Sequence, residues 1–263
     1  MGNITSYFLP KTEEVLSFDN PEDAITNNNF HDLKLLRDYG CLMDTSHLIL
    51  ATKLGHIEIM KWLLTQFSVK LNEKIFSTAV KSGNPETVDF LIDIGCPYNK
   101  NIFNNACYYG NLDIVSLVFN KLNTRTFICE AVAYENAIEG SNIEIVKFLF
   151  DNNIPYNFFI TTVAVRYNNL DILKLLVEKG IDLTTITFNI AAEHGDTTIL
   201  DFLYDNDCPV EDYIMTFAIR SKKLENVKWF IDKKISYDKR VFKRIRDKLT
   251  SEMVSFLSEE KLI

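Results

Sequence analysis

An alanine recurs along this chain at a nearly constant interval, and a similar sequence segment follows each occurrence. The positions are Ala24, Ala51, Ala79, Ala106, Ala137, Ala164, Ala191 and Ala218, separated by 27, 28, 27, 31, 27, 27 and 27 residues. A small or polar residue usually stands four positions later, and large apolar residues follow at positions nine to twelve. A fixed period in this range indicates stacked repeats, none of which buries its apolar face alone.

Each repeat is predicted to form two short helices joined by a tight connection. Apolar residues at helical spacing surround the alanine, as in Phe76, Ala79 and Val80. The first helix should end at the residue four positions after the alanine, because glycine readily takes the left-handed conformation of a helix end. These predicted ends are Gly55, Gly83, Gly110, Ser141, Asn168, Gly195 and Lys222. The second helix should begin near a carboxylate such as Glu58 and end at Gly40, Gly95, Asn153, Gly180 or Asp207.

The repeats divide the chain into three predicted parts. Residues 1–20 form an N-terminal extension, and residues 21–257 form an all-α solenoid of about eight stacked helix-turn-helix repeats. The repeats start near residues 21, 47, 75, 102, 129, 160, 187 and 214. Residues 240–263 form a C-terminal capping repeat. The interval of 31 residues carries four extra residues within 123–140, which fit a first helix that is one turn longer. Such a departure from the repeat indicates either a binding feature or tolerated drift in length.

The sequence segments that follow two of the alanines resemble a known family. The segments 55–64 (GHIEIMKWLL) and 141–150 (SNIEIVKFLF) resemble the second helix of ankyrin repeats, and the resemblance extends over about residues 24–257. Ordinary ankyrin repeats run about 33 residues. The shorter period here implies an ankyrin-like α-solenoid with minimal or absent β-hairpin fingers. It is similar to the shortened repeats of giant viruses of amoebae and of some protists, which implies the cytoplasm of a host cell.

The resemblance implies a non-enzymatic scaffold for protein–protein interaction, and the residues offer little chemistry beyond that. His31, His47, His56 and His194 lack the spacing of paired metal ligands, and the five cysteines form no Cys-x-x-Cys pair. Neither a phosphate-binding glycine loop nor a Ser-His-Asp arrangement is present. We therefore expect no metal, no cofactor, no small-molecule substrate and reduced thiols, and the protein is expected to be a monomer.

The candidate partner-binding residues lie two and three positions after the repeated alanines. They are Tyr108, Tyr109, Arg166, Tyr167 and His194. Exposed tyrosine and arginine are enriched among the residues that dominate binding energy. If the first helices line a concave side, as in ankyrin proteins, the tyrosines face one shared groove. The alternative is that the rings pack between neighbouring helices.

Two further features allow other functions. Residues 218–248 hold twelve Lys/Arg and four Asp/Glu, in a chain of net charge −8. The basic patch comprises Lys233, Lys234, Lys239, Arg240, Lys243, Arg244 and Arg246. It predicts either a solvated terminal repeat or a site for nucleic acid, anionic lipid or an acidic partner. The first six residues match the pattern for N-myristoylation at Gly2, which would make the protein a membrane-tethered adaptor.

Overall fold

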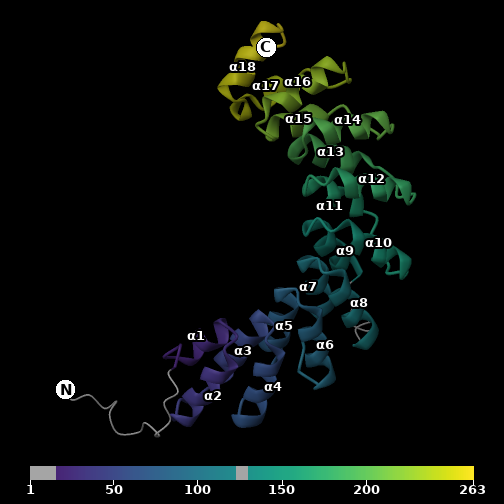
Figure 1. Cartoon of the computed structure of the whole chain (residues 1–263). Helices are drawn as coiled ribbons and strands as arrows, with labels where there is room; N and C mark the ends of the chain where they lie inside the picture. The colour runs from purple at the N-terminus through teal and green to yellow at the C-terminus, as the bar shows by residue number, and fades with distance from the viewer. Residues whose placement is uncertain (1–15, 123–129) are drawn as a thin grey trace, which may run out of the picture. The chain divides into compact units, whose positions relative to one another are not determined.

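The computed structural model describes residues 16–122 and 130–263 (Figure 1). The helices belong to two compact units. Unit 1 comprises Met1–Ile128 and unit 2 comprises Cys129–Ile263. Within the described residues all regular structure is helical, with no strand. This confirms the predicted all-α class and the absence of β-hairpins over these ranges. No helix there is long and apolar enough to cross a membrane.

Unit 1 consists of four helix pairs. The helices are α1 (Pro21–Thr26), α2 (Phe30–Asp38), α3 (Thr45–Leu54), α4 (Ile57–Gln66), α5 (Glu73–Ser82), α6 (Pro85–Asp93), α7 (Ile102–Tyr109) and α8 (Leu112–Lys121). The first helices of the pairs, α1, α3, α5 and α7, pack on one another in chain order, and the second helices form a parallel row (Figure 1).

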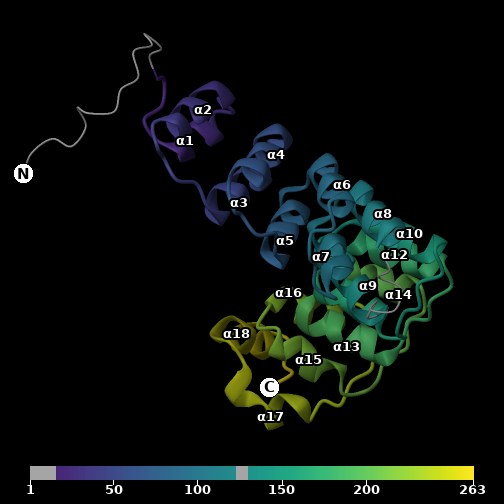
Figure 2. The same cartoon turned by 90° about the horizontal axis from the view of Figure 1, so that it is seen from below.

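Unit 2 continues the same plan. Its helices are α9 (Glu130–Glu139), α10 (Ile143–Asp151), α11 (Ile160–Arg166), α12 (Leu170–Glu178), α13 (Thr185–His194), α14 (Thr197–Asp205), α15 (Ile214–Arg220), α16 (Leu224–Asp232), α17 (Val241–Arg244), the 3-10 helix η3 (Arg246–Lys248) and α18 (Ser251–Glu259). First helices α9, α11, α13 and α15 form one layer. The short α17 and the longer α18 occupy the region predicted to cap the repeats (Figure 2).

The repeated alanines lie where neighbouring first helices meet. All eight are buried, and the small side chain allows the next repeat to approach closely. The second helices complete the core with residues such as Leu149 and Leu176, which are fully buried as predicted.

The helix ends follow the predicted register, with one exception. Gly55, Gly83 and Gly110 have φ values of 75°, 75° and 76°, and the other predicted ends also take positive φ apart from Gly195. Gly195 has φ −66°, so the left-handed prediction is wrong there. A Cβ on Gly195 would lie 2.8 Å from the Ala191 carbonyl oxygen. Glycine at this position permits a close backbone approach instead.

The irregular interval falls partly outside the described residues. Helix α9 spans Glu130–Glu139, and residues 123–129, directly before it, are not among the residues described. A longer first helix in this repeat therefore stays a prediction.

Most second helices begin with a side-chain cap five positions after the alanine. The capping residues whose side chains accept a backbone N–H bond are Asn29, Asn84, Asn111, Asn142, Asn169 and Asp196. His56 and Lys223 occupy the same position without such a bond. An asparagine there satisfies an N–H group that the helix leaves unpaired, which fixes where the second helix begins.

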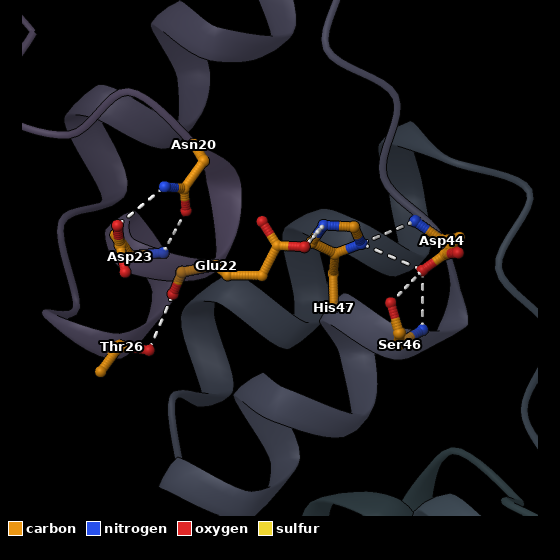
Figure 3. A network of polar contacts seen from close by, with 7 residues as sticks. All are labelled: Asn20, Glu22, Asp23, Thr26, Asp44, Ser46 and His47. Atoms are coloured by element: carbon orange, nitrogen blue, oxygen red, sulfur yellow. Dashed lines mark hydrogen bonds and ion pairs between the residues drawn. The ribbon is translucent and has the colours of Figure 1, made fainter.

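A polar network around His47 joins α1 to α3, the first helices of the first two repeats (Figure 3). Nε2 of His47 on α3 lies 3.3 Å from Oε1 of Glu22 on α1. Nδ1 of the same ring lies 3.1 Å from the backbone N of Asp44, the N-cap of α3. The ring is 8% exposed, so this histidine has a structural role between two adjacent repeats.

Candidate partner-binding surface

The predicted tyrosines of unit 1 form an exposed aromatic pair at the end of α7. Tyr108 and Tyr109 are 41% and 40% exposed, and their rings meet edge to face with centroids 5.2 Å apart. Nζ of Lys81, at the end of α5, lies 5.5 Å from the centroid of the Tyr109 ring. This geometry leaves two phenol rings and an ammonium group available to a partner.

The predicted residues of unit 2 are exposed as well. Arg166 and Tyr167 lie at the end of α11, and His194 ends α13. Partial burial and then a hydrogen bond with the Glu139 carboxylate raise the pKa of Tyr167. The Tyr167 ring therefore bridges two adjacent repeats while 42% of the residue stays accessible.

The positions two residues after the alanines alternate in charge along unit 2. Glu139, Arg166, Glu193 and Arg220 occupy them in order. An Arg220 nitrogen lies 3.1 Å from Oε1 of Glu193, whose side chain is 18% exposed. Tyr108 and Tyr109 belong to unit 1 and Arg166 and Tyr167 to unit 2, so the shared groove remains a prediction.

A second exposed row in unit 2 was not predicted from the sequence. Phe159, Ile186 and Tyr213 each stand five positions before their alanine, and Phe158 precedes the first of them. These four residues, here called the apolar strip, are between 37% and 68% exposed. The 27-residue register of large apolar residues was the signal that could have identified them.

One contact between adjacent repeats and one contact within a repeat lie beside the strip. The buried hydroxyl groups of Thr161 and Thr187 lie 3.1 Å apart and join α11 to α13. The Tyr213 ring packs 6.0 Å from the Phe217 ring on α15. Scattered exposed apolar residues are ordinary on protein surfaces, whereas a continuous group is typical of an interaction site.

The basic patch contains both paired and unpaired side chains. Nζ of Lys233 lies 2.9 Å from Asp201, and Arg240 and Arg244 lie 2.9 Å and 3.9 Å from Asp238. Over residues 16–122 and 130–263, no ion pair involves the remaining members, which are Lys234, Lys239, Lys243 and Arg246. Lys243 and Arg246 line a cavity of about 390 Å³ beside α18.

Among the described residues, no group of three or more His, Cys, Asp or Glu could hold a metal ion. Burial raises the pKa of the Cys96 thiol to about 11 and that of Cys208 to about 12, so both stay protonated near neutral pH. Gly2, the predicted lipidation residue, lies outside the described residues.

Comparison with known families agrees with this geometry. A family model for ankyrin repeats (3 copies) matches residues 76–160 and 103–187. No curated protein matches the chain. The matched residues run from α5 into α13 and include Tyr108, Tyr109, Arg166 and Tyr167. From residue 76 to residue 187, the chain is therefore similar to ankyrin repeats.

Proposed function

We propose that this chain is a non-enzymatic scaffold that binds a protein partner through side chains exposed on its first helices. Ankyrin repeats support protein–protein interaction in general. The observation that carries the proposal is the contrast within single helix ends. Tyr108 and Tyr109 are about 40% exposed, although Ala106 beside them is buried.

The predicted binding residues suit an interface rather than a catalytic site. Tyrosine and arginine supply large contact area together with hydrogen-bonding groups, and both are common among residues that dominate binding energy. Arg166 and Tyr167 stand side by side at the end of α11. A partner that covers them would bury an aromatic ring and a guanidinium group together.

The test is a double substitution, Tyr109→Ala with Tyr167→Ala, in the full chain. We expect it to abolish recovery of the partner from cells of the native host, measured by quantitative mass spectrometry, with little change in the thermal midpoint. Tyr204→Ala is the control, because Tyr204 is 43% exposed but lies on a second helix. Loss of folding would assign the rings to the core, and unchanged recovery by a folded variant would place the site elsewhere.

The place of action is a separate proposal. The resemblance to shortened repeats of giant viruses and protists is the basis for proposing such an origin and a cytoplasmic location in the host cell. The sequence pattern at Gly2 supports a membrane-tethered form of the same scaffold. The intact mass of protein expressed with a myristoyltransferase checks the lipid, and Gly2→Ala is the matched control.

A further inference from the structure

We propose that the apolar strip of unit 2 binds a cationic segment of a protein partner, in which large apolar side chains are interspersed with Lys or Arg. The proposal rests on the scaffold function above and names the class of partner. It concerns a surface that is separate from the predicted tyrosine pair of α7.

The strip offers large apolar side chains at a regular spacing. Phe159, Ile186 and Tyr213 occupy one repeat position on three successive first helices, and α11 packs on α13 as α13 packs on α15. Phe158 adds a ring that is 68% exposed. A partner segment lying across these helices would contact one large apolar side chain in each repeat.

The charge of the surrounding repeats selects the kind of segment. Residues 130–217 hold fifteen Asp/Glu and four Lys/Arg. Asp182, Glu211 and Asp212 are exposed near the strip, and none of the three has an ion pair within the described residues. An acidic surface attracts a cationic segment and repels anionic lipid, nucleic acid and a second copy of this chain, whose net charge is −8.

A buried amide holds one residue of the strip in place. Asn189 lies on α13, one turn after Ile186, and is 7% exposed. Its side chain shares a hydrogen bond with Tyr213, at the start of the next first helix. This contact joins two adjacent repeats at the strip.

The next repeat limits how far such a segment extends. Arg240 occupies the strip position there, and Lys239 stands beside it. The two repeats are joined at this point by the backbone N–H of Asp238, which donates to the Asp212 carbonyl oxygen at 2.9 Å. The apolar, acidic surface therefore meets a basic one just after Tyr213. We expect the cationic segment to cover α11, α13 and α15 and to stop there.

The experiment measures fluorescence anisotropy with two labelled peptides and the full chain. One peptide combines Leu and Phe with Lys in an amphipathic pattern, and its matched partner has every Lys replaced by Glu. We expect the cationic peptide to bind at least about tenfold more tightly than its acidic counterpart. We expect salt to weaken this binding.

Two sets of substitutions then locate the site. We expect the combined substitutions Phe158→Ser, Ile186→Ser and Tyr213→Ser to lower the affinity for the cationic peptide by about tenfold or more. Tyr108→Ser with Tyr109→Ser should leave its affinity within about twofold. All these side chains are partly exposed, and circular dichroism checks that each variant is folded.

Three results would overturn the proposal. They are equal affinity for the two peptides, unchanged affinity in the folded strip variant, and loss of affinity in the tyrosine-pair variant alone. The last result would place the cationic partner on the surface of the proposed function and leave that function intact. Failure of the host-cell test with normal peptide binding at the strip would instead remove the tyrosine site alone.

Discussion

The first helices of the two units share one frame but present different surfaces. Five positions before the alanine, unit 1 carries Ser46, Lys74 and Asn101, all exposed and polar. Unit 2 carries Phe159, Ile186 and Tyr213 at that position. The backbone plan is the same, so the difference lies in side chains that the fold does not require. Binding specificity in such a protein is a property of particular repeats rather than of the solenoid.

The helix ends differ between the units as well. Residues with positive φ in unit 1 are Asn28, Gly40, Gly55, Gly83, Gly95 and Gly110. Those in unit 2 are Ser141, Asn153, Asn168, Gly180, Asp207, Lys222, Lys234 and Lys261. Unit 2 thus places mostly non-glycine residues in a conformation that costs L-amino acids about 1–2 kcal/mol each. The same turn geometry is present in both units, but the backbone at these turns is more strained in unit 2.

The largest expected effect tests whether the two units share one core register. Leu91 and Leu176 stand twelve positions after their alanines and are fully buried. Replacing either by Ala should lower the free energy of unfolding by about 2–5 kcal/mol, because it removes buried apolar atoms and leaves a cavity. Denaturant titration followed by circular dichroism measures this. A change within about 0.5 kcal/mol in either unit would mean that the register assigned to it is wrong.

Thiol alkylation of the cysteines also tests whether the same repeat positions are buried in both units. Sγ of Cys96 lies 3.6 Å from the Asn72 carbonyl oxygen, and Sγ of Cys208 lies 3.4 Å from that of Thr184. Burial raises the two thiol pKa values to about 11 and about 12 from an ordinary 9.0. From the fraction of thiolate at pH 8, we expect Cys96 to react with iodoacetamide roughly a hundredfold, and Cys208 roughly a thousandfold, more slowly than a free thiol does.

Half-exposed Cys41, at the same repeat position, is the internal comparison for that experiment. The native thiol pKa values are raised, so their contribution to stability is present below about pH 9 and is lost as the pH rises toward 11 or 12. Mass-spectrometric mapping of alkylation follows all the sites together. Equal, fast labelling of Cys96 and Cys41 would contradict the buried position of Cys96.

Substitutions at the helix ends should change the free energy of unfolding by less, and with opposite signs in the two units. Gly83→Ala should cost about 1–2 kcal/mol, since its φ of 75° disfavours a Cβ although no atom lies within 4 Å of it. Lys222→Gly and Lys234→Gly should each gain about 0.5–1 kcal/mol, since the entropy of glycine offsets part of the relieved strain. Thermal unfolding measures the three variants together. A neutral Gly83→Ala would remove the strain difference between the units.

The smallest expected effect concerns the caps of the second helices. The Asn84 side chain accepts from the backbone N of Thr87 at 2.9 Å, and the Asn169 side chain accepts from that of Ile172 at 3.1 Å. Asn84→Ala and Asn169→Ala should each cost about 1 kcal/mol, while replacement by Asp should cost little. Equal losses in the two units would support one shared cap, whereas an unaffected variant would show that its helix does not depend on the bond.

Much of the fold could be predicted from the sequence, because the repeat shows which positions of successive units are equivalent. The buried alanines, the burial of Leu149 and Leu176 and most helix ends followed from spacing alone. Gly195 did not, because a close approach and a left-handed φ both favour glycine and spacing does not distinguish them. The capping asparagines were not predicted, because the carboxylates two positions later also suit the first turn of a helix.

The candidate surface was predicted only in part for a related reason. Exposure of Tyr108 and Tyr167 followed from their place at the helix ends. The exposure of Ile186 depends on what the neighbouring loops leave uncovered, which periodicity does not report. The hydrogen bond between Asn189 and Tyr213 depends on three-dimensional packing and has no signature in the order of residues.

We propose that a cationic segment binds unit 2 through the apolar strip and leaves the tyrosine pair of unit 1 uncovered. Hydroxyl-radical footprinting of the full chain with the cationic peptide tests it directly, because it reports the accessibility of individual side chains. We predict lower modification of Phe158, Ile186 and Tyr213 on peptide binding, with Tyr108 and Tyr109 unchanged. Protection of Tyr108 and Tyr109 with Phe158, Ile186 and Tyr213 still fully modified would contradict the claim.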